Sequence, residues 1–276
     1  MSDCGRLAPA RFASALLVLF LLLTACASRG EGQNPSAAVQ ILRVAAAADL
    51  QPVLPAVLAV FEKRTGIHAE ASYQSSATLA TQIINGAPFD IFFAADLSFP
   101  QRVVDAGRAV ENRPIPYAKG TLVLWTRNDS GIPSLSLEAL RNPAIRSIAI
   151  ANPDHAPYGR AAQDAIEHSG ILSAVHPKLV IAENIAQAAQ YAESGNAQVG
   201  FVSFTAALTP RLRAEGHFVL VPAEDYPPIL QGAILVRGSA GAAAASRFLE
   251  FFESQEVARI LSSKGLEPIQ QVPAQP

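Results

Sequence analysis

The sequence is short of charged residues, and cysteine is absent after position 26. Only 16% of the 276 residues are charged, and 21 basic against 23 acidic residues give a formal net charge of −2. No run of basic residues interrupts this balance, so we expect no nucleic-acid partner. Both cysteines, Cys4 and Cys26, lie near the N-terminus. If that segment is processed, no disulfide can form within the mature body.

The motifs of common enzyme classes are also absent from the sequence. There is no GxSxG turn, no GxxxxGK[ST] phosphate loop and no HExxH motif. The five histidines are scattered without the spacing of a metal site. Asp154-His155 is the one suggestive pair, and we interpret it as part of a turn because Pro153 and Pro157 flank it. We therefore expect neither an enzyme nor a resident metal or cofactor.

Apolar residues are abundant, at 50% of the chain, which is ample for a large buried core. Part of this excess lies in the unbroken apolar run at residues 15–23, which follows Arg6 and Arg11. A membrane helix needs about 20 apolar residues, so this run is too short to be one. It fits the central part of a secretory signal.

The tetrapeptide Leu-Thr-Ala-Cys, which ends at Cys26, follows this run directly. It resembles the lipobox of bacterial lipoproteins, in which the cysteine is lipidated and becomes the mature N-terminus. We expect a signal peptide at residues 1–25, lipidation of Cys26 and a flexible tether at residues 26–39. The body would then be a membrane-anchored lipoprotein on the periplasmic or cell-envelope side. An ordinary signal peptide cut nearby, with Cys26 incidental, is the alternative.

Short apolar runs typical of strands alternate with helical patterns from Gln40 onward, which indicates an α/β fold with mostly parallel sheet. The expected strands lie at residues 41–47, 68–73, 91–94, 121–126, 147–151, 178–181, 199–203, 217–222 and 231–236. The expected helices lie at residues 52–64, 76–85, 99–106, 159–169, 185–194 and 242–263. Roughly 235 residues is large for one core, so we expect two lobes.

Small polar segments stand where expected strands give way to helices. The four junctions are Ala47-Ala48-Asp49, Gln74-Ser75-Ser76-Ala77-Thr78, residues 152–159 and Ala182-Glu183-Asn184-Ile185. Helix N-termini expose free N–H groups and carry a partial positive charge, so four of them converging on one crevice would bind an anion without lysine or arginine. Taken singly, each junction is explained by ordinary N-capping, for which Ser76 and Asn184 are suitable residues.

Six segments together resemble the periplasmic molybdate-binding proteins of ABC transporters. They are VAAAADL (44–50), SSATLATQI (75–83), GAPFDIFFAAD (86–96), LVLW (122–125), ANPDHAPYG (151–159) and ENIAQ (183–187). The resemblance extends across residues 41–265 and implies a two-lobed type II periplasmic-binding fold. Each lobe would be a mostly parallel sheet flanked by helices, with the ligand in the cleft. Lobe 1 would comprise residues 40–118 and 226–276, and lobe 2 residues 119–225.

The resemblance also implies an oxyanion site. Carried over by position, its residues are Ala48, Asp49, Ser76, Tyr158 and Ile185, with Ser203 as a weaker candidate because other members place a tyrosine there. Some members have serine, threonine or asparagine in place of Asp49, and a carboxylate that faces a dianion would be repelled. We therefore expect Asp49 to supply its N–H while its carboxylate caps the helix or points away. Molybdenum would be present only within the bound oxyanion.

The function implied is that of a monomeric binding protein that captures molybdate, or tungstate, and delivers it to a membrane permease with ATPase subunits. A cavity with hydrogen-bond donors alone would favour fully ionised molybdate, tungstate and sulfate over phosphate, which carries a proton near neutral pH. Binding of another small oxyanion, such as sulfate or thiosulfate, is the alternative, because the same donors serve any small dianion. An iron(III) site would be expected to use adjacent tyrosines, and none of the five tyrosines is adjacent to another.

Overall fold

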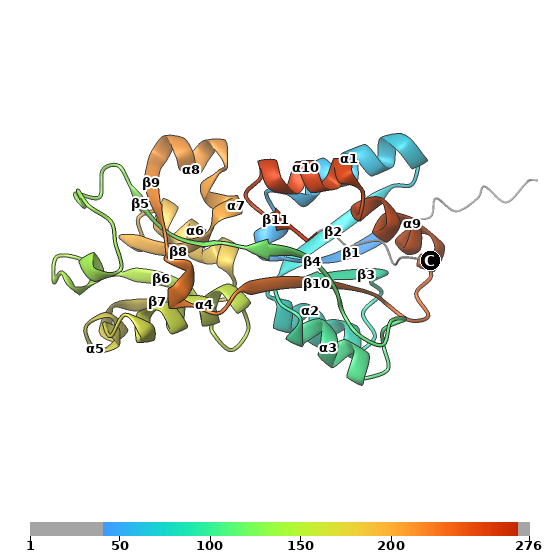
Figure 1. Ribbon diagram of the computed structural model, residues 1–276, viewed down its shortest axis with the longest axis horizontal. Helices are drawn as coiled ribbons and strands as arrows, with labels where there is room; N and C mark the ends of the chain where they lie inside the picture. Colours follow the sequence, from blue (N-terminus) through green and yellow to red (C-terminus); the bar gives the residue numbers. More distant parts are fainter. Residues whose placement is uncertain (1–40, 270–276) are drawn as a thin grey trace, which may run out of the picture. The chain divides into compact units, whose positions relative to one another are not determined.

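The computed structural model describes residues 41–269. The expected signal peptide at residues 1–25, the lipidation site Cys26 and the tether at residues 26–39 lie outside the described residues. Within residues 41–269 the chain forms two β-sheets, each accompanied by helices (Figure 1). No helix in this part of the chain is long and apolar enough to cross a membrane.

The first sheet contains six strands in the order β11-β4-β10-β3-β1-β2. Their bounds are β1 Leu42–Ala47, β2 Ala69–Gln74, β3 Ile91–Ala94, β4 Ile115–Gly120, β10 Ile229–Leu235 and β11 Glu267–Pro268. β1 is parallel to both β2 and β3. β10 runs antiparallel to β3 and β4, and β11 runs antiparallel to β4.

The second sheet contains five strands in the order β7-β6-β8-β5-β9. Their bounds are β5 Leu122–Arg127, β6 Ile148–Ala151, β7 Leu179–Ala182, β8 Val199–Ser203 and β9 Gly216–Leu220. β6 is parallel to β7 and β8, whereas β5 is antiparallel to β8 and β9. The chain thus enters this sheet after β4 and leaves it before β10.

Both sheets are mixed, although the alternation of strands and helices predicts mostly parallel sheets. The parallel pairs involve strands separated by helices, because a parallel connection needs a crossover of about a dozen residues or more. β5 and β10 instead arrive directly from the other sheet, so they need no crossover helix and pair antiparallel with their neighbours. The apolar periodicity of a strand does not encode its direction.

The helices lie between the strands and after β10. Their bounds are α1 Leu54–Thr65, α2 Ser76–Ile84, α3 Ser98–Asp105, α4 Pro157–His168, α5 Leu172–Val175, α6 Ile185–Glu193, α7 Phe204–Ala207, α8 Pro210–Glu215, α9 Ala242–Phe252 and α10 Gln255–Ser263. Short 3-10 helices occur at η1 Ala48–Leu50, η2 Glu138–Arg141, η3 His176–Lys178 and η4 Ala223–Asp225. The sequence patterns missed β4, β11, α5, α7 and α8.

Three predicted helices differ from the structure by two residues or more at one end or in number, and the other three differ by one residue at one or both ends. The helix expected from Pro52 begins at Leu54, which places Pro55 in its first turn, where the ring replaces an N–H that has no partner. α4 begins at Pro157 rather than at Gly159, again with proline in the first turn. The single helix expected at residues 242–263 is two helices, because the Ser254 side chain accepts a hydrogen bond from the Val257 amide and starts α10.

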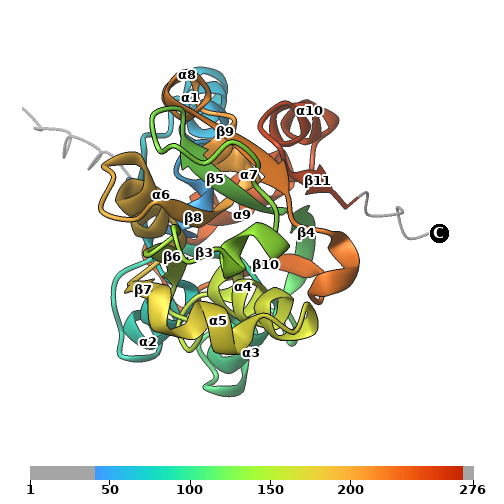
Figure 2. The ribbon, with the colours of Figure 1, turned by 90° about the vertical axis from the view of Figure 1, so that its left-hand side faces the viewer.

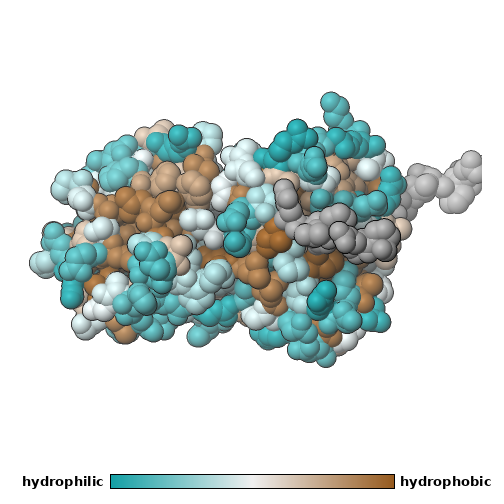
Figure 3. Space-filling view, in the orientation of Figure 1, coloured by the Kyte–Doolittle hydropathy of each residue, from teal (hydrophilic) through white to brown (hydrophobic). Residues whose placement is uncertain are grey.

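Each sheet has its own hydrophobic core on either face. In the first sheet, Val44 and Ala46 of β1 pack toward α1 and α9, while Ala45 packs toward α2 and α3. In the second sheet, α4 and the start of α6 contribute to one core cluster, and α6, α7 and α8 contribute to a second. Figure 2 shows α4 and α6 beside β6. On the face drawn in Figure 3, hydrophobic residues gather mainly over the elements of the second sheet.

Candidate functional site

A small cavity lies where the four predicted junctions meet. Its volume is about 10 Å³, far below the roughly 300–1,000 Å³ of pockets that bind organic ligands. Its lining consists of Ala47, Ala48, Asp49, Gln74, Ser75, Ser76, Ala95, Ala156, Pro157, Tyr158, Asn184 and Ile185. The structure therefore brings together five predicted site residues, namely Ala48, Asp49, Ser76, Tyr158 and Ile185. Their contact with a ligand stays a prediction.

Ser203 does not line this cavity. It is the N-cap of α7, where its Oγ accepts a hydrogen bond from the Ala206 amide at 3.3 Å. The same Oγ lies 2.9 Å from the Thr205 hydroxyl oxygen. The Ser203 side chain is thus occupied in starting a helix, which explains a polar residue at this strand end without a ligand.

Backbone N–H groups converge on the cavity because strands end and helices begin there. Ser76 and Ile185 are the first residues of α2 and α6, and Tyr158 is the second residue of α4. First-turn amides have no acceptor within their own helix. Within the described residues, the amides of Ala48, Ser76, Tyr158 and Ile185 donate to no protein acceptor. The carboxyl group of Asp49 accepts a hydrogen bond from the amide of the same residue. The amides of Ala48, Ser76, Tyr158 and Ile185 are available to an anion.

Ser75 and Asn184 cap two of these helices. The Ser75 Oγ accepts from the Thr78 amide at 3.2 Å, so Ser75 rather than Ser76 is the N-cap of α2. Asn184 is confirmed as the N-cap of α6, with its Oδ1 3.0 Å from the Gln187 nitrogen. Ser76 is left with a different role: its Oγ accepts from the Ala95 amide at 3.1 Å. The Ser76 hydroxyl hydrogen therefore remains available to an acceptor in the cavity.

Asp49 is the only charged residue in the lining, and it is 1% exposed. Its Oδ2 accepts a hydrogen bond from Gln231 Nε2 at 2.6 Å and another from the Tyr158 hydroxyl at 3.3 Å. Its Oδ1 has no partner among the described residues. Of the two roles expected for this carboxylate, capping the helix or pointing away, the structure excludes the first, because η1 has no side-chain cap. Burial raises the pKa of Asp49 to about 7, although the hydrogen bonds from Gln231 and Tyr158 lower it.

Gln231 is a fully buried polar residue that sequence reasoning missed. The Tyr117 hydroxyl donates to Gln231 Oε1 at 2.7 Å, which turns the Gln231 NH₂ group toward Asp49. Gly120 makes room for this arrangement, because a Cβ at that position would lie 2.1 Å from the Tyr158 hydroxyl oxygen. The one available signal was a glutamine in the otherwise apolar strand β10. Its partners come from β4, α4 and η1, which no local pattern connects.

Comparisons with known proteins assign the chain to a family. The sequence profile described as "Bacterial extracellular solute-binding protein" matches residues 42–267. The chain belongs to this family. It is 34% identical over 231 residues to the molybdate-binding protein ModA of Rhodobacter capsulatus, covering 84% of this chain and 89% of the relative. It is 26% identical over 253 residues to the putative ABC transporter substrate-binding lipoprotein YvgL of Bacillus subtilis, covering 91% and 95% of the two chains.

A solved structure extends this likeness to the fold. The periplasmic molybdate-binding protein of Azotobacter vinelandii superposes with a TM-score of 0.76 at 31% identity, covering 82% of this chain and 98% of that one. The two mixed sheets with flanking helices are therefore a type II periplasmic-binding fold, as the sequence predicts.

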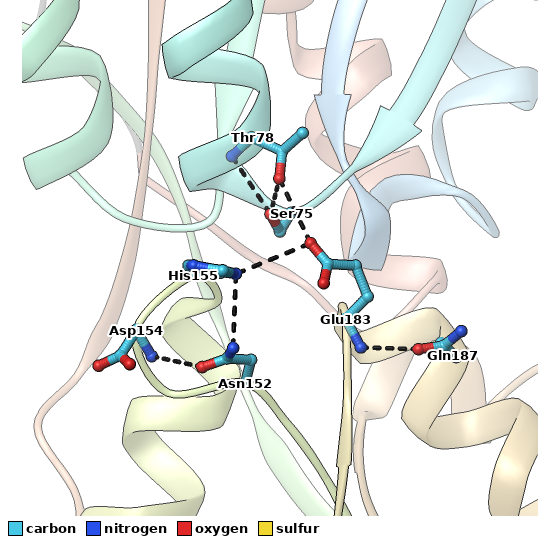
Figure 4. Close-up of polar contacts among 7 residues, drawn as sticks. All are labelled: Ser75, Thr78, Asn152, Asp154, His155, Glu183 and Gln187. Atoms are coloured by element: carbon cyan, nitrogen blue, oxygen red, sulfur yellow. Dashed lines mark hydrogen bonds and ion pairs between the residues drawn. The ribbon is translucent and has the colours of Figure 1, made fainter.

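In this solute-binding protein, polar contacts near the cavity join helices and loops of the first sheet to helices and loops of the second. Glu183 Oε1 lies 3.5 Å from the Thr78 hydroxyl of α2 and 3.7 Å from His155 Nδ1 (Figure 4). The Ala77 amide donates to the His155 carbonyl at 3.1 Å. Arg160 of α4 forms an ion pair with Asp96, which follows β3. These contacts join elements of the first sheet to elements of the second beside the cavity.

The Asp154-His155 pair lies in a turn, as the sequence predicts. The Asp154 amide donates to Asn152 Oδ1 at 2.9 Å, which stabilises that turn (Figure 4). His155 additionally contacts Glu183 at the cavity rim, a contact between distant segments that the sequence did not indicate.

Proposed function

We propose that this chain is the solute-binding component of an ABC importer for molybdate, and for tungstate equally. It captures the anion as a monomer in the periplasm or at the cell envelope and delivers it unchanged to a permease with ATPase subunits. The observation that carries this proposal is the convergence of Ala48, Ser76, Tyr158 and Ile185 amides on one small cavity without lysine or arginine. The relatives named molybdate-binding proteins support the choice of anion.

Oriented neutral donors suit this ligand. Removing a dianion from water costs tens of kcal/mol in a simple estimate, so many donors are needed. Each hydrogen bond to a charged group contributes about 1.5–3 kcal/mol, and helix N-termini add their partial positive charge. The donors would contact the anion's oxygens, and no side chain would coordinate molybdenum itself.

The selectivity of the site is tested by titration calorimetry with molybdate, tungstate, sulfate and phosphate under the same buffer conditions. We expect tight binding of molybdate and tungstate. Sulfate is also fully ionised but smaller, so the cavity must discriminate against it by size. Tight sulfate binding with none to molybdate would contradict the proposal and favour the alternative, a sulfate or thiosulfate carrier.

We also propose that a lipid on Cys26 anchors the chain to the membrane, a proposal that rests on the lipobox-like sequence and is consistent with a relative named as a lipoprotein. Cys26→Ser should move the protein from the membrane fraction to the soluble fraction of an expressing bacterium. Retention of the variant in membranes would show that this residue is not the anchor. Molybdate binding by the released variant should match that of the wild type.

A further inference from the structure

Asp49, whose carboxyl group is buried, lies in the lining of the cavity that we propose binds a dianion. Among the described residues, Asp49 has no lysine or arginine partner, and the side-chain hydrogen bonds from Gln231 and Tyr158 both reach Oδ2, while Oδ1 receives none. An ionised carboxylate next to a dianion in this water-poor setting would repel it strongly. An asparagine would keep the same shape without that cost. Binding of a dianion beside Asp49 therefore requires that the negative charge of the carboxylate be neutralised.

The groups around Asp49 cannot neutralise it. The titratable groups that face it are the phenols of Tyr158 from α4 and Tyr117 from β4, and burial raises the pKa of both well above the usual value. Both remain uncharged donors at neutral pH. The other neighbours, Gln231 of β10 and Thr205 of α7, do not titrate.

The remaining elements that pack against η1 do not supply a counter-charge either. They are α6, α7 and β2. α7 has no titratable residue, and those of α6 and β2 are Tyr191, Glu193, Glu70 and Tyr73. Among the described residues, none of these four forms a hydrogen bond or ion pair with Asp49. With no counter-charge from these described neighbours, a proton can neutralise Asp49.

We propose that Asp49 shares one proton with the bound oxyanion, so that each anion captured brings one proton from solvent into the cavity. The inference rests on the proposed function and names a specificity determinant within it. The proton lies between Oδ1 and an oxygen of the anion, where it converts a repulsive pair into a hydrogen bond. Oδ2 stays with Gln231 and Tyr158, which fix the carboxyl plane. Burial also favours the protonated acid, as the raised pKa of Asp49 indicates.

A proton-sharing acid also changes which anions the site accepts. A cavity that has only hydrogen-bond donors provides no acceptor for a hydroxyl group on the ligand. Asp49 Oδ1 can donate to a fully ionised oxygen when protonated, or accept from a protonated oxyanion when ionised. We therefore expect less discrimination against hydrogen phosphate or hydrogen arsenate here than in an Asp49→Asn variant.

Calorimetry of the full mature chain with molybdate tests this inference. Titrations at pH 8 in buffers of different ionisation enthalpy should show uptake of close to one proton per molybdate. The dissociation constant should rise about tenfold per pH unit above pH 8, where molybdate itself is fully ionised. Asp49→Asn should bind with no proton uptake and a flat pH profile, whereas Asp105→Asn, an exposed acid on α3, should behave as wild type.

The outcomes separate the two proposals. Wild-type binding of molybdate without proton uptake would overturn the sharing of a proton and leave the proposed function intact. A pH profile of Asp49→Asn identical to that of wild type would do the same. A chain that binds no molybdate would contradict both proposals. If Asp49→Asn fails to fold, the buffer series on the wild type decides alone.

Discussion

Ser75 and Ser76 are adjacent residues with the same side chain, and the structure gives them different tasks. Ser75 caps α2 through the Thr78 amide, whereas the Ser76 hydroxyl accepts from Ala95 and keeps its hydrogen for the cavity. A serine at the end of a strand is thus consistent with either capping or binding. The contact made by its oxygen distinguishes the two roles.

Ser76→Ala removes one charge-assisted donor from the proposed site. We expect molybdate affinity to fall by about 1–3 kcal/mol, since a hydrogen bond to a charged group contributes on that order. Ser203→Ala is the matched control, because its hydroxyl caps α7 and lies outside the cavity lining, and its affinity should equal that of wild type. Equal affinity for Ser76→Ala and wild type would place the anion elsewhere.

At the scale of elements, the sequence predicted the parts of the site that depend on where strands end and helices begin. Ala48 and Ser76 follow adjacent parallel strands of the first sheet, and Tyr158 and Ile185 follow adjacent parallel strands of the second. Local patterns located these four junctions, and the family resemblance named the residues within them. Gln231 was missed because its role depends on Tyr117 and Asp49, which are far away in the sequence.

β4 was missed for a local reason. Pro116 lies within it, and proline argues against a strand because it cannot donate a ladder hydrogen bond. The structure accommodates Pro116 opposite Gly232, at the point where the register between β4 and β10 shifts. An irregular strand of this kind carries no clear periodic signal.

α9 and α10 are separate helices, and Ser254 is the N-cap at the start of α10. Ser254→Ala removes the side-chain acceptor of the Val257 amide at the start of α10. We expect the free energy of unfolding to fall by about 0.5–2 kcal/mol, the usual cost of losing an N-cap. Denaturant unfolding measures this change, and molybdate affinity should stay constant because Ser254 is not part of the cavity lining. An unchanged unfolding midpoint would mean that the capping bond contributes little.

At the scale of the whole molecule, the cavity lies where elements of both sheets meet. Asp49 follows β1 and Tyr158 lies in α4, yet their side chains meet, and the Ala77 amide reaches the His155 carbonyl. Binding and closure would therefore be coupled, because the anion receives donors from both sides only when these elements come together. The low content of charged residues is compatible with such a site, since backbone amides replace cations.

The central claim is that amides at four strand–helix junctions hold a tetrahedral oxyanion. Anomalous X-ray scattering from molybdenum, in crystals of the chain grown with molybdate, locates the anion directly. We expect one peak in the cavity, with its oxygens about 2.7–3.2 Å from the amide nitrogens of Ala48, Ser76, Tyr158 and Ile185. A molybdenum peak outside this cavity, with the cavity itself empty, would contradict the claim.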